Sequence, residues 1–485
     1  MFSLLQNKFK HFLNIKKQNK VFINMKKNLL SKNIHQWLFL LVCFMTTLPS
    51  WAEDYTRDGI IYNLDKSTKT ATVKRLEDKS ATSAEIRSYA AGCKVVSIEE
   101  LAFVDCSSLT SINIPSSINS IGSDAFAYCS SLTSINIPSS VTSIGSSAFA
   151  RCSSLTSINI PSSVTSIRLY AFLGCSALTS INIPSSVTSI GSDAFSGCSS
   201  LTSINIPSSV TIIEQSAFKD CSSLTSINIP SSVTTIGEGA FSGCSSLTAF
   251  TVDADNPNYC AEGCMLFNKE KTTLVCASGG QKTYNIPSSV TSIGNSAFTR
   301  CSSLTSINIP SSVTSIGSQA FSGCSALTSI NIPSSVTSIG SQAFFYCSSL
   351  TEINIPNSVN SIGHYAFEGC KALTSINIPS SVTSIGVSAF SRCSALKTVV
   401  LQSDHVTFGS DVFTENTNIY AVSDKLELEL DLRWNYNNGP DVRKELGGIW
   451  YTCGITTIRY KGSVFITSVV GTLLDKNSAK ICGIA

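Results

Sequence analysis

The sequence predicts an α/β solenoid in which short parallel strands stack on the concave face and short helical or 3₁₀ turns lie opposite. Two observations carry this prediction. A unit of 23 residues, CSSLTSINIPSSVTSIGSSAFAR at residues 129–151, recurs through most of the 485-residue chain. One part of the unit alternates apolar and polar residues, which is the pattern of a strand with one buried face. Because repeats of about 20–50 residues stack into one continuous core, we expect a single array rather than separate domains.

Two residue types mark the register of the units. Eleven of the fourteen prolines share one position, from Pro115 to Pro379. Twelve cysteines share another position: Cys106, Cys129, Cys152, Cys175, Cys198, Cys221, Cys244, Cys301, Cys324, Cys347, Cys370 and Cys393.

The first half of the unit has the pattern of a strand. Ile135 and Ile137 are expected to face the core, while Ser134 and Asn136 face outward. Proline has no N–H group to donate to a neighbouring strand, so Pro138 ends the strand.

The second half of the unit returns the chain to the next strand. Val141 and Ile144 are expected to face the core as the chain turns back, and Ala148 and Phe149 to pack in a short helical or 3₁₀ turn. No single unit can bury these side chains alone, so folding requires several stacked units.

The pattern L-x-x-I-x-I-P-x-x-V-x-x-I-G-x-x-A-F-x-x-C, which covers about residues 95–413, resembles the BspA-type leucine-rich repeats. The resemblance implies a leucine-rich-repeat solenoid. Members of that family are typically secreted or displayed on the cell surface, and they are mostly regarded as adhesins or surface antigens. The resemblance therefore implies a surface protein that binds host matrix proteins, host surface proteins or glycans.

Residues 1–52 are interpreted as a leader with a signal peptide. They hold eight lysines and no acidic residue, and the apolar stretch at 37–48 is followed by Ser50-Trp51-Ala52, a small-x-small cleavage pattern. The apolar stretch is shorter than the ~20 residues of a transmembrane helix, and no segment of the mature chain reaches that length. We expect cleavage near Ala52 and secretion or surface display. The mature chain then has a net charge of −5, since 26 basic residues face 31 acidic ones.

The mature chain divides by its departures from the repeat. The predicted division is 53–94 as an N-terminal cap hairpin, 95–420 as the solenoid with a hairpin insertion at about 250–283, and 421–485 as a C-terminal region without an assigned fold. The insertion is predicted because Cys244 and Cys301 lie 57 residues apart, 34 more than one unit.

The residues give no reason to predict an enzyme. The mature chain has two histidines, His364 and His405, and neither lies beside the Asp, Ser or Cys pattern of a catalytic triad. Carboxylates such as Asp124 and Glu214 occupy scattered loop positions rather than a paired acid site. The sequence has neither a phosphate-binding glycine loop nor a basic stripe. We predict no catalytic residue, no cofactor and no nucleic-acid partner.

The cysteines are expected to be structural. In-register cysteines would lie ~4.8 Å apart, beyond the ~3.5–4.5 Å Cβ spacing of disulfides, so they are predicted to pack as small buried hydrophobes. Cys260, Cys264 and Cys276 could supply three zinc ligands, but no histidine lies near them and a fourth ligand is missing. A local disulfide or plain packing is favoured there, and no metal site is predicted.

The outward strand positions are the candidate binding surface. Asn recurs there, usually two residues after a Ser, so that stacked units would present a flat polar strip. The predicted strip residues are Ser134, Asn136, Ser157, Asn159, Ser180, Asn182, Ser203, Asn205, Ser226, Asn228, Asn308, Asn331 and Asn354. An equally weighted interpretation is that recent duplication left tolerated polar residues on a wet sheet face.

Residues near the Ala-Phe turn are more varied and mark a second edge that a protein partner could recognise. They include Asp124, Tyr128, Arg151, Tyr170, Lys219, His364 and Tyr365.

These observations together predict a surface protein that mediates adhesion or binds host proteins or glycans. The main alternative is a structural spacer that displays residues 421–485 and has no ligand of its own. A remoter alternative is ice binding by the regular Ser/Asn strip.

Overall fold

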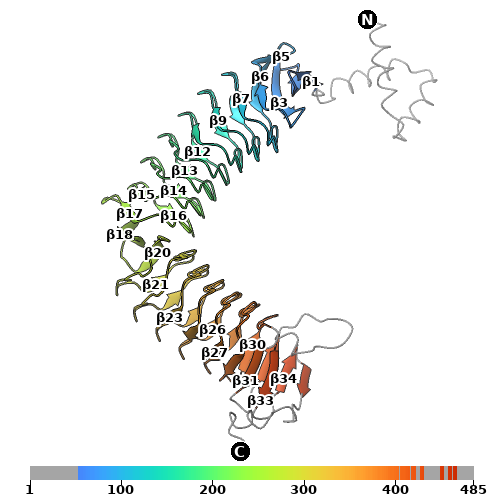
Figure 1. Cartoon of the computed structure of the whole chain (residues 1–485). Coiled ribbons are helices and arrows are strands. Elements are labelled where there is room, and N and C mark those ends of the chain that lie inside the picture. Colours follow the sequence, from blue (N-terminus) through green and yellow to red (C-terminus); the bar gives the residue numbers. More distant parts are fainter. Residues whose placement is uncertain are drawn as a thin grey trace, which may run out of the picture. The chain divides into compact units, whose positions relative to one another are not determined.

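The structure is a computed structural model, and it describes residues 53–403, 405–414, 417–421, 427–430, 448–452, 457–460 and 463–466. The leader and its cleavage site lie outside the described residues. Two ladders of short parallel strands run along the stacked turns of the chain (Figure 1).

The first ladder is built from the Ser-Ile-Asn segments, and like residues lie beside one another. Ser157 pairs with Ser134, and Asn159 pairs with Asn136. Its strands are β4 (Ser83–Glu85), β7 (Ser111–Asn113), β9 (Ser134–Asn136), β11 (Ser157–Asn159), β15 (Ser226–Ile229), β17 (Ala249–Val252), β23 (Ser329–Asn331), β25 (Glu352–Asn354), β27 (Ser375–Ile378), β29 (Thr398–Leu401), β31 (Thr417–Ala421) and β33 (Gly448–Thr452).

A second parallel ladder, which the sequence did not predict, lies at the Val-x-x-Ile part of the unit. Ser143 and Ile144 pair with Ser120 and Ile121. Its strands are β6 (Cys93–Ile98), β8 (Ser120–Ile121), β10 (Ser143–Ile144), β12 (Ser166–Ile167), β13 (Ser189–Ile190), β14 (Ile212–Ile213), β16 (Thr235–Ile236), β21 (Ser292–Ile293), β22 (Ser315–Ile316), β24 (Ser338–Ile339), β26 (Ser361–Ile362), β28 (Ser384–Ile385), β30 (His405–Phe408), β32 (Glu427–Leu430) and β34 (Thr457–Tyr460). Two-residue strands are too short to show a periodicity of their own.

The Ala-Phe turn is not helical, and the described residues contain neither an α-helix nor a 3₁₀ helix. The predicted helical turns are therefore wrong, for a reason visible in the hydrogen bonds. The N–H groups of Ala150 and Cys152 bond within the turn, but those of Phe149 and Arg151 donate to carbonyls of the next turn. Ser147 and Arg151 also have left-handed backbone, with φ of 54° and 59°. Consecutive helical hydrogen bonds cannot form under these conditions.

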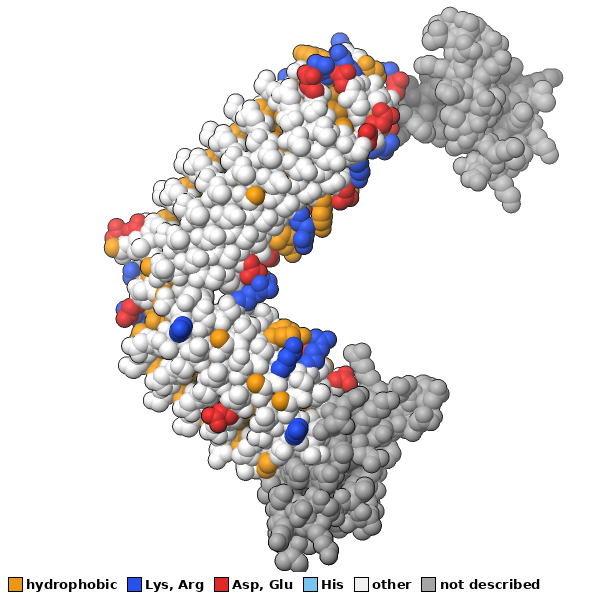
Figure 2. Space-filling view, viewed as in Figure 1, with side chains coloured by type: hydrophobic (Ala, Val, Ile, Leu, Met, Phe, Trp, Pro, Cys, Tyr) orange, Lys and Arg blue, Asp and Glu red, His pale blue; other side chains and the backbone are white. Residues whose placement is uncertain are grey.

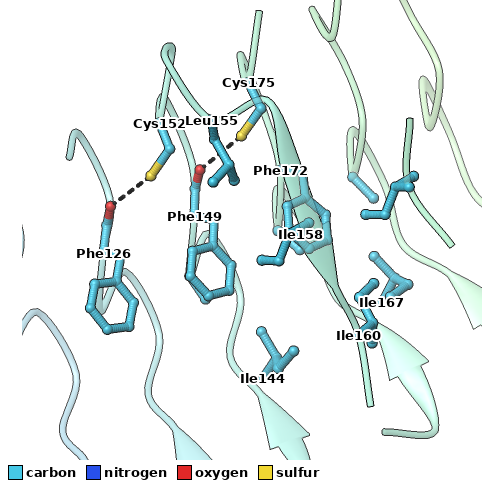
Figure 3. Close-up of a cluster of buried hydrophobic side chains, with 14 of the residues drawn as sticks. Phe126, Ile144, Phe149, Cys152, Leu155, Ile158, Ile160, Ile167, Phe172 and Cys175 are labelled. Atoms are coloured by element: carbon cyan, nitrogen blue, oxygen red, sulfur yellow. Dashed lines mark hydrogen bonds between the residues drawn. The ribbon is translucent and has the colours of Figure 1, made fainter. Parts of the chain in front are cut away.

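The core consists of one apolar column for each inward position of the unit. The predicted inward residues are all buried: Leu132, Ile135, Ile137, Val141, Ile144, Ala148 and Phe149. Phe149 stacks between Phe126 and Phe172, with ring centroids 5.4 and 5.6 Å apart (Figure 3). The prediction of which strand positions face inward is confirmed.

Additional strands stand at the N-terminal end. The strands β1 (Glu53–Arg57), β2 (Ile60–Asp65) and β3 (Thr70–Leu76) are neighbours in one sheet, in which β3 pairs in parallel with β6. The strand β5 (Tyr89–Ala90) pairs with β6 in the antiparallel direction. In the turn after β2, the Asp65 carboxylate accepts hydrogen bonds from the backbone N–H groups of Ser67 and Thr68.

An antiparallel meander interrupts the repeat between β17 and β21. Its strands are β18 (Tyr259–Glu262), β19 (Met265–Asn268) and β20 (Thr273–Ala277). The Asn268 side-chain oxygen accepts hydrogen bonds from the N–H groups of Thr272 and Thr273 in the turn before β20. Because β20 pairs in parallel with β21, the meander continues the second ladder rather than standing apart from it.

Both ladders continue past the last recognisable unit. The backbone of β29 pairs with β31, and β31 pairs with β33. The backbone of β30 pairs with β32, and β32 pairs with β34, all in parallel. The strand β35 (Ser463–Ile466) then pairs antiparallel with β34. Sequence reasoning assigned no fold here because the apolar motif is lost while the backbone pairing is retained.

Candidate binding surface

The Asn side chains of the first ladder form a row on the surface of the solenoid. Bridges join Asn159 to Asn182 and Asn182 to Asn205, so the row continues where no strand is named. Every strip residue predicted from the sequence is exposed. Neighbouring turns repeat at about the ~4.8 Å spacing of paired strands, which gives a regular row of amides.

Other polar side chains of the unit serve the solenoid itself. The Thr156 hydroxyl donates to the carbonyl of Thr133 in the preceding turn at 3.2 Å, and the Thr142 hydroxyl donates to Asn119 in the same way. The half-buried Ser186 hydroxyl donates to the carbonyl of Val164 at 2.5 Å. These hydroxyls bond to backbone, so they are scaffold rather than ligand donors.

The Ser/Asn pairs of the strip differ from these scaffold hydroxyls. Among the described residues, Ser157 and Asn159 have no side-chain hydrogen bond to protein, and the same holds for their equivalents Ser134 and Asn136. Their donors and acceptors are therefore open to water or to a ligand. Composition could not separate the two groups, because Ser and Thr are common at both kinds of position.

The strip is divided in two by the meander. Asn228 pairs with Thr251 of β17, and the Thr251 hydroxyl donates to the carbonyl of Ile227. The Asn row resumes at Asn285, which bridges to Asn308. The break falls where the long spacing between Cys244 and Cys301 predicted an insertion at about 250–283.

A shallow cleft at the break was not predicted from the sequence. It has a volume of about 280 Å³ and is lined by β17, the start of β18 and Lys269. The Lys269 ammonium donates to the carbonyls of Ala254 and Asn256 at 3.3 and 2.6 Å. The ammonium group that lines the cleft is therefore bonded to the backbone of the loop before β18.

The cysteines are free thiols throughout the described residues. In the cysteine row, the Cys152 thiol donates to the carbonyl of Phe126, and the Cys175 thiol donates to that of Phe149 at 3.1 Å (Figure 3). Burial raises the pKa of Cys175 to about 12, so the thiol stays protonated at neutral pH. Cys260, Cys264 and Cys276 are also free thiols. Of the two alternatives predicted for them, a local disulfide or plain packing, the structure has plain packing.

No cluster of three potential metal ligands is found in the described part of the chain. His364 accepts a hydrogen bond at Nδ1 from the backbone N–H of Val387, which is a role in joining two turns. The described residues also contain no helix that could span a membrane.

Comparison with known families decides the relationship. The model of the BspA-type leucine-rich repeat region matches residues 74–199, 165–269, 276–355 and 318–427, together more than half of the chain. The chain belongs to the BspA-type leucine-rich repeat family. No curated protein matches it.

Solved structures of bacterial leucine-rich-repeat proteins resemble this BspA-type chain. A leucine-rich cell surface protein from Faecalibacterium prausnitzii is 36% identical, with a TM-score of 0.62 over 73% of this chain and 96% of that one. A leucine-rich repeat protein from Bacteroides ovatus is 28% identical, with a TM-score of 0.43 over 76% of this chain and 100% of that one.

The varied edge of the BspA-type unit lies beside the Ala-Phe turn. Tyr128 is 50% exposed, and the Arg151 guanidinium lies over its ring, 5.7 Å from the centroid. In a later turn, Arg392 donates to the Tyr346 hydroxyl at 2.7 Å and lies 3.4 Å from the Glu368 carboxylate. Arg151 therefore contacts the face of a tyrosine ring, whereas Arg392 contacts a tyrosine hydroxyl and a carboxylate.

Proposed function

We propose that this chain is a secreted or cell-surface protein that mediates adhesion by binding host proteins or glycans along the Ser/Asn strip. The observation that carries the proposal is that two groups of polar side chains in the unit have different hydrogen-bond partners. Thr and Ser hydroxyls such as those of Thr156 and Ser186 bond to backbone, whereas the Asn amides of the strip are exposed and have no protein hydrogen-bond partner among the described residues. The family and the surface location of the F. prausnitzii relative support the same role.

An extended partner suits this arrangement. One exposed amide offers neutral hydrogen bonds worth a net ~0.5–1.5 kcal/mol each in exchange with water, so a single turn binds weakly. Several turns that engage one polymer raise the avidity by ~10²–10⁴ through effective concentration. Secretion, which the proposal requires, rests on the leader at residues 1–52.

Binding by the mature chain tests the proposal. Residues 53–485 are passed over immobilised host matrix proteins and glycans, and a variant with Asn136, Asn159, Asn182, Asn205 and Asn228 changed to Ala serves as the comparison. A matched control changes exposed threonines such as Thr156 to Ser, which keeps the hydroxyl and the inter-turn hydrogen bond.

The two function hypotheses give different results in this experiment. The proposal predicts that at least one partner binds the wild type and the Thr control but not the Asn variant. If no partner binds, the solenoid is a spacer that displays residues 421–485. If the Asn variant binds equally well, the strip is scaffold and the binding surface lies elsewhere on the chain.

A further inference from the structure

A second surface, separate from the strip, lies where three successive turns expose large side chains. We call Tyr128, Arg151, Leu169 and Tyr170 the Tyr-Arg edge. Tyr128, Leu169 and Tyr170 are 50%, 41% and 38% exposed. Figure 2 shows hydrophobic and cationic side chains along one margin of the stack, beside a broad face almost without charge.

Backbone hydrogen bonds place these residues in adjacent turns. The N–H of Tyr128 donates to Ala150, beside Arg151, and the N–H of Ser147 donates to Leu169. Tyr128, Arg151 and Tyr170 all have left-handed backbone, with φ between 57° and 63°. Non-glycine residues adopt that backbone uncommonly. The next two turns carry glycine at the position of Arg151, namely Gly174 and Gly197.

The Arg151 side chain lies between Tyr128 of the preceding turn and Gly174 of the next. Its guanidinium lies over the Tyr128 ring, and its Cγ lies 3.4 Å from the place that a Cβ of Gly174 would occupy. Stacking uses the flat face of a guanidinium and leaves its N–H edge free to bind an oxyanion with two hydrogen bonds.

Arg151 is also free of an acidic partner. Within the described residues no carboxylate lies within 4.0 Å of Arg151, and the same holds for Arg75 and Arg168, whereas several other arginines are paired. Those with carboxylate partners include Arg87 with Asp58, Arg300 with Asp220, and Arg392 with Glu368.

We propose that the Tyr-Arg edge binds a protein partner that presents a carboxylate beside an apolar side chain. Arg151 donates two hydrogen bonds to the carboxylate, and Leu169 and Tyr170 cover the apolar side chain. Tyr and Arg are the residue types that dominate the energy of protein interfaces. Leu169 offers no hydrogen bond to a sugar hydroxyl, which favours a protein over a glycan. This inference is independent of the Ser/Asn strip and goes beyond the proposed function.

Selection from a displayed library of random dodecapeptides against residues 53–485 tests the proposal. Enriched peptides are synthesised and their affinities measured by fluorescence anisotropy for the wild type, Arg151→Ala, Arg151→Lys and Tyr128→Ala. Arg300→Ala is the matched control, because it occupies the same position of the unit but is paired with Asp220. A further control carries the five Asn→Ala changes of the strip. Thermal unfolding confirms that each variant is folded.

The expected result is an enriched motif with Asp or Glu next to a large apolar residue. Its affinity should fall about tenfold or more in Arg151→Ala, as for the loss of a charge-assisted hydrogen-bond pair, and less in Arg151→Lys. Arg300→Ala and the strip variant should bind as the wild type does. The proposal is overturned if no acidic motif is enriched or if Arg151→Ala binds the peptides normally. It is also overturned if an acidic polysaccharide, and no peptide, shows the dependence on Arg151.

Discussion

Each turn depends on its buried phenylalanine, so truncating one ring should be costly. Phe149 is fully buried between two other rings. We expect Phe149→Ala to lower the free energy of unfolding by ~3–5 kcal/mol, as for other core aromatic truncations. Asn136→Ala, on the exposed face, should change it by no more than ~0.5 kcal/mol. Urea unfolding followed by circular dichroism measures both. Equal losses would mean that the faces of the strand are reversed.

The buried thiols make the folding stability of the protein depend on pH in the alkaline range. Burial raises the pKa of Cys347 from an ordinary value of 9.0 to about 12. Above pH 9 the unfolded chain loses this proton while the folded chain keeps it, so the thiol's contribution to stability is complete below pH 9 and is lost as the pH rises toward 12.

The contribution of one thiol can be measured with Cys347→Ser. The serine hydroxyl can keep the hydrogen bond to the carbonyl of Phe321 but does not titrate in this range. We expect the melting temperature of the variant to fall less steeply than that of the wild type between pH 9 and 12. Parallel curves would show that the Cys347 proton is not linked to folding.

Residue by residue, the sequence predicts burial better than it predicts backbone. The alternation around Ile135 and Ile137 was sufficient to place both side chains in the core. The bend after the second strand of the unit is harder to predict, because glycine, as at Gly145, occupies it in most units but Arg168 and Glu214 occupy it in others. A Cβ at Gly145 would lie 2.4 Å from the Ser123 nitrogen, so the backbone at this bend packs closely against the preceding turn.

At the scale of elements, the meander is joined to the preceding turn through one buried side chain. Asn256 is fully buried, and its amide donates to the carbonyls of Pro230 and Val233 at 2.8 and 3.1 Å. Its side-chain oxygen accepts from the N–H groups of Asn258 and Tyr259. Four hydrogen bonds therefore meet at a residue that the sequence gave no reason to select.

Removing this junction should loosen the meander. Asn256→Ala leaves several buried groups unpaired, at ~1–3 kcal/mol for each group. Asn256→Asp should also destabilise, because a carboxylate oxygen then faces two carbonyls. Limited proteolysis should cut the variants between β17 and β20 faster than the wild type, while the exposed Asn258→Ala serves as the control. Unchanged cleavage would contradict the role given to Asn256.

The elements that sequence reasoning missed have a common physical cause. The second ladder and the strands from β31 to β34 are defined by backbone pairing, which is nearly independent of the side chains. Patterns of apolar residues reveal elements only where those residues repeat often enough. The Ser-Ile-Asn strands met that condition, and the two-residue strands did not.

On the scale of the whole molecule, the strip is a row of similar exposed Asn side chains in two stretches. One stretch runs to Asn228 and the other begins at Asn285. The placement of its residues could be predicted from the sequence, because it follows from the strand alternation. The cysteine spacing also indicated the insertion that breaks the strip. The separate roles of the Thr hydroxyls required the structure, since they depend on contacts between turns.

The central claim is that binding depends on the number of turns engaged, and an affinity series tests it most directly. Asn→Ala is introduced at Asn182 alone, then at Asn159, Asn182 and Asn205, and then in five turns. Surface plasmon resonance measures each variant against a ligand identified with residues 53–485. We predict a graded loss at each step, because each turn contributes a similar small increment. An unchanged affinity in the five-turn variant would contradict the claim and leave the strip as scaffold.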